Sequence, residues 1–254
     1  MAKIVIIGRG GTGKTSFTAL TAKYLIELGE TPILLVDTDP DQNLGEMVGV
    51  DLERESKHSI TELLYATFIE QGGTTIGIPP SERIESRIWT EGLYEGPSFD
   101  FMAVGTKWTE GCYCLPDAAL KRAMGSLSKT YRHILIDSPA GLENLNRRIT
   151  GDMDDIFDLV DPSQKSFEHV IRAHRVIREV KIEFKNFYLV GGHRFPEELG
   201  PEISRRTGLK FVGKVPFDEQ LASYVLEGKS LLEIRATSPA YNAVKTIMAG
   251  VGYR

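Results

Sequence analysis

A glycine-rich segment directly after the first apolar run constrains this chain more than any other feature of its sequence. The run Ile4–Ile7 leads into Gly8-Arg9-Gly10-Gly11-Thr12-Gly13-Lys14-Thr15, and a helical pattern follows from Lys14 to Leu28. The spacing fits G-x-x-x-x-G-K-[ST], in which glycines let backbone N–H groups turn inward around phosphate oxygens at a helix N-terminus. Because the motif requires this order of strand, loop and helix, we predict a phosphate-binding loop here.

Each residue of this loop has a predicted role in binding a nucleotide. The Lys14 ammonium group would neutralise the β- and γ-phosphates, and the Thr15 hydroxyl would bind Mg²⁺. The other nucleotide-binding positions of the segment are Gly8, Arg9, Gly10, Gly11, Thr12, Gly13 and Ser16. The sequence therefore predicts a P-loop nucleoside triphosphate hydrolase that uses ATP, ADP and Mg²⁺.

Apolar runs rich in β-formers alternate with longer helical patterns, which is typical of βαβ units around a largely parallel sheet. The expected strands are Lys3–Ile7, Pro32–Val36, Phe99–Val104, His133–Ile136, Ile156–Val160, Phe187–Val190 and Lys210–Val215. The expected helices are Lys14–Leu28, Thr61–Ile69, Leu115–Thr130, Gln164–Val180, Glu197–Thr207, Asp218–Glu227 and Pro239–Ala249. We predict an α/β fold, in which residues 1–254 form a single P-loop ATPase domain with a mostly parallel, twisted β-sheet flanked by helices.

One stretch fits neither pattern. Gln71–Ser98 contains several glycines and prolines with scattered charges. Since long loops of this composition run over protein surfaces, we interpret the stretch as a surface excursion and not as a domain boundary.

Charge and hydropathy argue against some partners. The chain has 30 Lys+Arg against 35 Asp+Glu, a formal net charge of −5, whereas nucleic-acid binding usually needs a basic stripe. No apolar run approaches the roughly 20 residues that span a bilayer, and Ile4–Ile7 is too short for a signal-peptide core. Ala240–Arg254 has no clear basic amphipathic face. We expect a cytoplasmic protein that binds neither nucleic acid nor membrane.

Two acidic segments follow predicted strands, at the edge of an open α/β sheet where ligands bind. The first is Val36-Asp37-Thr38-Asp39-Pro40, and the second is Ile134-Leu135-Ile136-Asp137-Ser138-Pro139-Ala140-Gly141. An aspartate in such a position can hold Mg²⁺ directly or through water. Alone, each segment could equally be a turn or a helix cap, but beside a phosphate-binding loop both indicate nucleotide chemistry.

Together these segments resemble the deviant-Walker ATPases of the MinD/ParA class, which also includes the nitrogenase iron protein. Arg9–Ser16 is similar to the deviant loop of that class, Asp37–Pro40 to switch I and Asp137–Gly141 to switch II. By this resemblance Asp39 would position or activate the attacking water and contribute to Mg²⁺ binding, and Asp137 would support the metal.

The C-terminal part extends the resemblance, with Val215-Pro216-Phe217-Asp218 followed by a helix that ends at Leu226-Glu227-Gly228-Lys229. It implies nucleotide contacts from Pro216, Phe217 and Asp218.

Two positions depart from the pattern of that class. Arg9 stands where the class carries a lysine that reaches the partner's nucleotide in an ATP-sandwiched dimer; an arginine keeps the charge but is planar and bulkier. We count Arg9 with Lys14 and Asp39 as the catalytic candidates. Gly191-Gly192-His193 stands where relatives place an asparagine that reads adenine, so main-chain contacts around Pro216 would have to supply base selectivity.

The two cysteines of the chain lie together in Cys112-Tyr113-Cys114. They follow a predicted strand and precede a predicted helix, and a helix N-terminus lowers the pKa of a thiol. Thiolates are soft ligands for Zn²⁺, Ni²⁺ or Cu⁺, and a closed tetrahedral site needs four ligands. Two protomers that share Cys112 and Cys114 would complete such a site. The alternative is that the pair packs as two small apolar side chains.

In this ATPase class, Gly111-Cys112-Tyr113-Cys114 looks like the CooC maturation factors of carbon monoxide dehydrogenase. This resemblance implies a nucleotide-linked homodimer that handles Ni²⁺ or Zn²⁺ at a shared Cys-x-Cys site, with apo carbon monoxide dehydrogenase or acetyl-CoA synthase as its client. Two other functions stay open: a MinD/ParA-like spatial organiser that binds membrane or DNA, and an iron–sulfur reductase like the nitrogenase iron protein. Because no cysteine follows position 114, the sequence disfavours the reductase.

Overall fold

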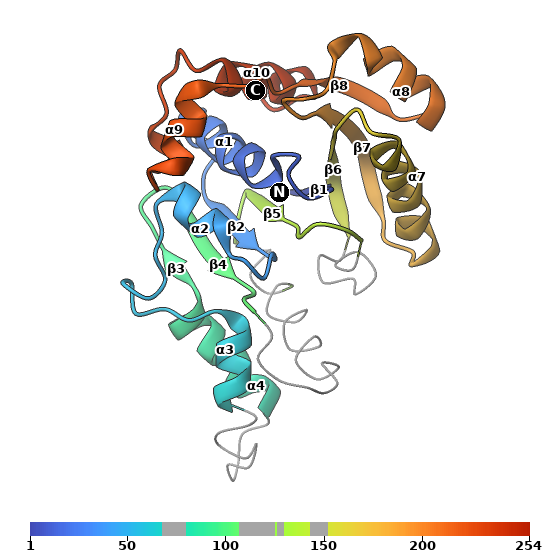
Figure 1. Ribbon diagram of the computed structural model, residues 1–254. Coiled ribbons are helices and arrows are strands. Elements are labelled where there is room, and N and C mark those ends of the chain that lie inside the picture. The colour runs from blue at the N-terminus through green and yellow to red at the C-terminus, as the bar shows by residue number, and fades with distance from the viewer. Residues whose placement is uncertain (68–79, 107–124, 126–129, 143–151) are drawn as a thin grey trace.

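An eight-stranded sheet runs through the molecule in the order β3-β4-β2-β5-β1-β6-β7-β8 (Figure 1). The strands are β1 (Ala2–Gly8), β2 (Ile33–Asp37), β3 (Tyr94–Glu95), β4 (Asp100–Ala103), β5 (His133–Asp137), β6 (Met153–Val160), β7 (Phe184–Gly191) and β8 (Lys210–Lys214). All neighbouring pairs are parallel except β3 and β4. This computed structural model describes residues 1–67, 80–106, 125, 130–142 and 152–254.

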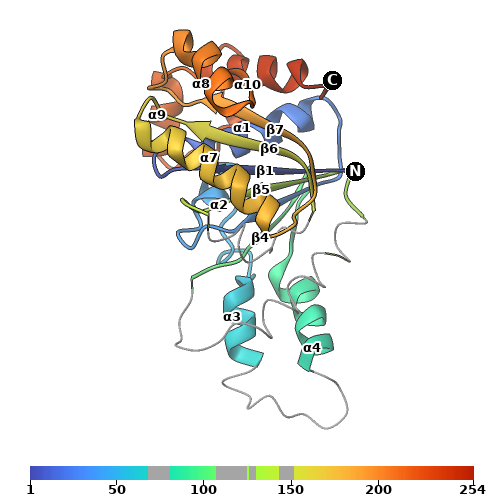
Figure 2. The same cartoon turned by 90° about the vertical axis from the view of Figure 1, so that its right-hand side faces the viewer.

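Helices cover both faces of the sheet, as a parallel sheet requires. They are α1 (Lys14–Glu27), α2 (Asn43–Val48), α3 (Ile60–Tyr65), α4 (Pro80–Arg87), α7 (Gln164–Glu179), α8 (Gly200–Thr207), α9 (Glu219–Leu226) and α10 (Pro239–Gly250). Short turns of other helix types occur at η2 (Ile88–Gly92), η3 (Glu197–Leu199) and η4 (Leu231–Glu233). In both ribbon views, α3 and α4 lie together beneath the sheet (Figures 1 and 2).

The first strand shows how the sequence divides its side chains between two cores. Val5 and Ile7 pack with residues of α3, α4 and α7, whereas Ile4 and Ile6 pack with residues of α1, α2 and α10. All four side chains are fully buried. Because successive side chains of a strand point to opposite faces, an unbroken apolar run is typical of a strand that is covered on both sides.

The predicted single α/β domain with a mostly parallel sheet is confirmed, and all seven expected strands are present. The helices expected at 14–28, 164–180, 218–227 and 239–249 are also present, within three residues at each end. The helix expected at 197–207 begins with the single 3-10 turn η3 and continues as α8. The helix expected at 115–130 lies almost entirely outside the described residues.

The interpretation of Gln71–Ser98 as a surface excursion is wrong for its described part. From residue 80 onward the chain forms α4, η2 and β3, and the side chains of Ile84 and Ile88 are fully buried in the core. These two residues are four apart and therefore share one helix face. Arg87 fixes the segment further, through an ion pair with Glu91 at 2.7 Å and a hydrogen bond to the Thr67 hydroxyl at 2.9 Å.

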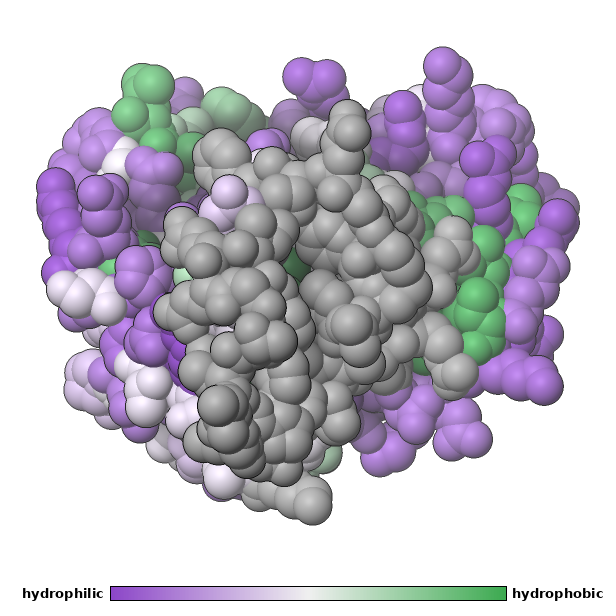
Figure 3. All heavy atoms as spheres, turned by 90° about the horizontal axis from the view of Figure 1, so that it is seen from below, coloured by the Kyte–Doolittle hydropathy of each residue, from purple (hydrophilic) through white to green (hydrophobic). Residues whose placement is uncertain are grey.

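The outer surface is largely polar where the view from below shows described residues, with apolar side chains gathered in small groups (Figure 3). Within the described ranges, no helix has both the length and the apolar character needed to cross a membrane.

Candidate nucleotide-binding site

Three glycines shape the loop between β1 and α1. Gly8, Gly11 and Gly13 have φ angles of 143°, 75° and 92°, which strain any residue with a Cβ. A Cβ on Gly8 would also lie 2.6 Å from the carbonyl oxygen of Leu159 on β6. Gly13 is the N-cap of α1, and no side chain caps this helix end. The first N–H groups of α1 therefore have no intrahelical or capping acceptor and can bind an anion.

Lys14 lies beside this helix end and is 7% exposed. Its Nζ donates a hydrogen bond to the carbonyl oxygen of Arg9 at 3.1 Å, and the Thr12 hydroxyl donates to the same oxygen at 2.8 Å. Burial lowers the pKa of Lys14, against the opposing effect of the Asp137 and Asp39 charges. A partly desolvated ammonium group beside free helix N–H groups is suited to neutralise a phosphate.

Asp137 ends β5 directly below the loop. Its Oδ1 accepts a hydrogen bond from the Thr18 hydroxyl at 3.2 Å, and Thr15 also hydrogen-bonds to this carboxylate. Its Oδ2 is buried and has no hydrogen-bond partner among the described residues. Burial raises the pKa of Asp137 to about 6. An orphan carboxylate oxygen beside a loop threonine is suited to bind a hydrated divalent cation, since Mg²⁺ is commonly held by one or two carboxylates, waters and phosphates.

The two acidic segments meet at the ends of β2 and β5, where Asp37 is in register with Asp137. Asp37 is fully buried and accepts hydrogen bonds from the backbone N–H groups of Asp39 and Leu44, each at 2.9 Å. The Thr38 hydroxyl and N–H donate to the carbonyl oxygen of Asp137 at 2.7 and 3.0 Å. Burial raises the pKa of Asp37 to about 7. Asp37 therefore orders the turn that presents Asp39, a role that the sequence prediction did not assign to it.

A pocket of about 520 Å³ opens next to the loop. The loop residues Gly11, Thr12, Gly13 and Ser16 line one side, and Val215–Asp218 with α9 line the other. Phe217 is 62% exposed in this pocket, and the exposed apolar residues Val225 and Leu226 also line it. Exposed apolar side chains that converge on one hollow beside a phosphate-binding loop are suited to a nucleotide base.

The predicted contact residues Pro216, Phe217 and Asp218 all line this pocket, but the Asp218 carboxylate is occupied. It caps α9 by accepting from the N–H groups of Gln220 and Leu221 at 2.8 and 3.2 Å. It also accepts from the Ser238 hydroxyl and the Ala240 N–H. Asp218 therefore shapes the wall of the pocket through its helix cap.

Residue 192 cannot carry a base-reading side chain in this arrangement. A Cβ on Gly192 would lie 2.7 Å from the carbonyl oxygen of Thr12 in the loop. The next residue, His193, is exposed and lines the pocket. Its ring centroid lies 6.3 Å from that of Phe217. The aromatic pair of His193 and Phe217 thus stands where the resemblance to the MinD/ParA class implies an asparagine side chain.

A buried carboxyl that the sequence prediction missed lies on β6. Asp158 is fully buried, and neither of its side-chain oxygens has a hydrogen-bond partner within the described part of the chain. His169 of α7 lies close to it, with 3.9 Å between Oδ1 of Asp158 and Nε2 of His169. Burial raises the pKa of Asp158 to about 8 and lowers that of His169 to about 4. Burial therefore favours the uncharged form of both groups.

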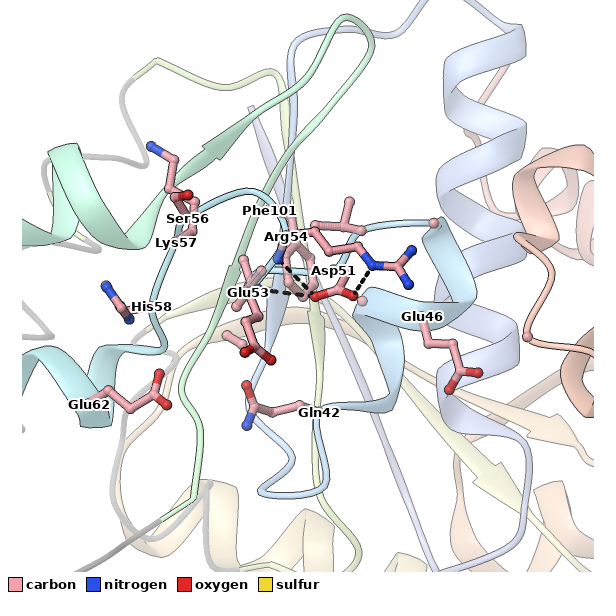
Figure 4. A pocket seen from close by; sticks show the side chains of 16 residues that line it. Gln42, Glu46, Asp51, Glu53, Arg54, Ser56, Lys57, His58, Glu62 and Phe101 are labelled. Carbon is pink, nitrogen blue, oxygen red and sulfur yellow. Dashed lines mark hydrogen bonds and ion pairs between the residues drawn. The ribbon is translucent and has the colours of Figure 1, made fainter.

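A second pocket, of about 880 Å³, lies between α2 and the start of α3 (Figure 4). Gln42 and Glu46 of the α2 region border it on one side, and His58 and Glu62 near the start of α3 border it on the other. Asp51 and Arg54, which also line it, form an ion pair with each other at 3.2 Å. No predicted nucleotide-binding residue lines this pocket, so it is distinct from the hollow beside the loop.

The predicted metal ligands Cys112 and Cys114 lie outside the described residues. Among the residues that are described, no three or more His, Cys, Asp or Glu side chains are grouped to hold a metal ion. The other predicted site residues converge at the carboxyl ends of the parallel strands. They lie on the loop, on switch I, at the start of switch II and in the 215–218 turn.

Comparison with known proteins agrees with this site. Residues 3–232 match the CobQ/CobB/MinD/ParA nucleotide binding domain. The chain belongs to this family. It is a P-loop ATPase.

Relatives match over nearly the whole chain. An uncharacterized ATP-binding protein of Methanocaldococcus jannaschii is 32% identical over 96% of both chains. The carbon monoxide dehydrogenase accessory protein CooC of Rhodospirillum rubrum is 25% identical over 94% of this chain and 91% of its own. Among solved structures, the septum site-determining protein MinD from Pyrococcus horikoshii, complexed with Mg-ADP, superposes with a TM-score of 0.70 at 20% identity. That superposition covers 99% of this chain and 96% of the MinD chain, and it supports the fold.

Proposed function

We propose that this ATPase is a nucleotide-switched metallochaperone that dimerises and delivers a divalent metal, for which we favour nickel, to apo carbon monoxide dehydrogenase or acetyl-CoA synthase. The supporting observation is the likeness to the Rhodospirillum rubrum CooC protein over nearly the full length of both chains, combined with the Cys112-Tyr113-Cys114 motif. Residues 1–254 would act as one ATPase domain.

In this proposal the loop Gly8–Ser16 binds the ATP phosphates and Lys14 neutralises them. The base occupies the pocket of about 520 Å³, against Pro216 and Phe217. Asp39, held by its backbone bond to Asp37, positions the attacking water. Such positioning and electrostatic stabilisation supply most of the catalysis in phosphoryl transfer.

Mg²⁺ fits the residues below the loop. The Thr15 hydroxyl, the free Oδ2 of Asp137 and the nearby Asp39 carboxylate would hold it directly or through water. When bound, Mg²⁺ neutralises the charge that develops on the phosphate oxygens. The solved MinD relative that is complexed with Mg-ADP has the same fold.

The metal cargo would bind between two chains. Each chain contributes the Cys112 and Cys114 thiolates, and the two pairs complete a four-ligand site for Ni²⁺ or Zn²⁺. Arg9 would reach the partner's nucleotide phosphates, so that ATP binding and metal binding favour the same closed dimer. By linkage, each ligand must then raise the affinity for the other.

The test is metal content and oligomer mass of the purified protein, measured with and without a non-hydrolysable ATP analogue. We expect one Ni²⁺ or Zn²⁺ per dimer, and a dimer that forms more readily with the analogue. The matched variant is Cys112→Ser with Cys114→Ser, which keeps the ATPase site and removes the thiolates. Unchanged metal stoichiometry and unchanged nucleotide-linked dimerisation in this variant would refute the proposal.

The MinD-like fold over almost the full chain also supports a second candidate, a spatial organiser that binds membrane or DNA in its ATP state. Co-sedimentation with anionic vesicles and with duplex DNA, at physiological salt and with the ATP analogue, separates the two functions. Nucleotide-dependent binding to either surface, without metal in the dimer, would favour the organiser.

A further inference from the structure

Arg9 is bound to its own chain in this structure. Its Nη1 donates to Asp161 Oδ2 at 3.2 Å and to Ser163 Oγ at 2.9 Å. Both acceptors lie in the turn that joins β6 to α7. The Arg9 side chain is 35% exposed and that of Asp161 is 25% exposed, so the guanidinium can turn toward solvent without opening the core.

The acceptor site for this guanidinium is held by its own hydrogen bonds. Asp161 Oδ1 accepts from the Ser163 N–H at 2.7 Å, which leaves Oδ2 for Arg9. Ser163 is the N-cap of α7, and its Oγ accepts from the Ser166 N–H at 3.2 Å. The Ser166 hydroxyl in turn accepts from the Asp161 N–H at 3.1 Å. The two oxygens that receive Arg9 are therefore fixed in place whether or not Arg9 is bound.

The carbonyl of Arg9 is also engaged, by Lys14 and Thr12. One residue thus joins the phosphate-binding loop to the first turn of α7. A partly exposed ion pair of this kind is weak, whereas a nucleotide phosphate carries more charge and forms forked hydrogen bonds with a guanidinium. Phosphate can therefore compete with Asp161 for Arg9, whose Nη1 is directed at its own α7 in this structure.

We propose that Asp161 and Ser163 are positioning residues that hold Arg9 on α7, and that Arg9 leaves them when it contacts nucleotide phosphate. The contact across a dimer rests on the function proposed above. The contact of Arg9 with Asp161 and Ser163 lies within one chain. It therefore constrains Arg9 whether or not the protein dimerises. Release of Arg9 would then make self-association depend on nucleotide.

The test is Asp161→Asn, which keeps an oxygen for the Ser163 N–H and replaces the acceptor of Arg9 by a donor. We expect the dissociation constant of the dimer, measured by sedimentation with a non-hydrolysable ATP analogue, to fall about two- to five-fold, since a partly exposed ion pair contributes about this much. Ser163→Gly removes the other acceptor, and glycine is tolerated as an N-cap. The matched control is Asp154→Asn, which removes the same charge from β6, where Asp154 pairs with Lys185.

The effect must depend on Arg9. In an Arg9→Ala background, Asp161→Asn should no longer change self-association, and this loss separates a holding contact from a general effect of charge or folding. Equal changes with and without Arg9, or weaker association of Asp161→Asn, would refute the inference.

Failure of the proposed dimer can be distinguished from failure of the inference about Arg9. If the wild-type chain stays monomeric with the analogue, the proposed dimer fails, and the affinity of the monomer for ATP then decides the inference. Arg9-dependent tightening of ATP binding in Asp161→Asn supports the holding contact, whereas an unchanged affinity overturns it.

Discussion

Replacement of Asp158 by asparagine should change how the stability of this protein depends on pH. Burial raises the pKa of Asp158 from 3.8 to about 8 in the folded chain, and the unfolded chain returns it to its ordinary value. An acid with a raised folded pKa makes the protein most stable below the unfolded pKa. That stability is lost as pH rises from 3.8 toward 8, because the unfolded state releases the proton first.

The size of the change in unfolding free energy follows from the pH range between the unfolded and folded pKa values of Asp158. Each pH unit between the two pKa values changes the free energy of unfolding by about 1.4 kcal/mol. Between pH 5 and pH 8.5 the wild-type protein should therefore lose about 4 kcal/mol through Asp158. Asparagine has nearly the same shape and no charge to bury, so the variant lacks this loss.

The assay is urea unfolding of both proteins at pH 5, 6, 7 and 8.5, compared as the difference in unfolding free energy. Contributions from Asp37 and Asp137, whose pKa values are about 7 and about 6, occur in both proteins and largely cancel. The difference should shift in favour of Asp158→Asn by about 2 to 4 kcal/mol as pH rises. If the difference in unfolding free energy between the two proteins did not change with pH, Asp158 would have to be ionised at neutral pH, and the reasoning would be refuted.

Two further predictions concern the base pocket and the corrected segment. Gly192→Ala places a Cβ 2.7 Å from the Thr12 carbonyl oxygen, so we expect binding of a fluorescent ATP analogue to weaken about ten-fold or more, as overpacking typically costs about 1–3 kcal/mol. Gly250→Ala, where no atom lies within 4 Å, is the control, and equal affinities of the two variants would contradict the close approach. Ile88→Ala should lower the free energy of unfolding in urea by about 2–5 kcal/mol, because its side chain is fully buried. Ser86→Ala, at an exposed position of the preceding helix α4, is the control and should leave the free energy of unfolding nearly unchanged. An equally small loss in Ile88→Ala would support the interpretation of this segment as a surface excursion.

The local features of this protein could be read from its sequence. An apolar run such as Ile4–Ile7 is buried on both faces wherever it lies in a parallel sheet. Gly8, Gly11 and Gly13 adopt backbone conformations that other residues avoid. The loop, the strands and the family resemblance depend on such neighbouring residues, and the structure and the comparisons agree with them.

Only the tertiary structure could show what distant segments do to one another. The burial of Ile84 and Ile88 depends on the position of α4 against the core, whereas their polar neighbours Glu85, Ser86 and Arg87 indicated an exposed segment in the sequence. The raised pKa of Asp158 needs β6 and α7 packed together, since an aspartate in a strand is otherwise free to face water.

The same distinction applies to Arg9, one of the two positions at which this chain departs from its class. The sequence places Arg9 in the phosphate-binding loop and indicates a cation that can contact phosphate. It does not indicate where the guanidinium rests, because Asp161 and Ser163 follow more than 150 residues later, at separations of 152 and 154. Long side chains are positioned by whatever acceptors the fold brings within reach, and such acceptors are a property of packing and not of local sequence.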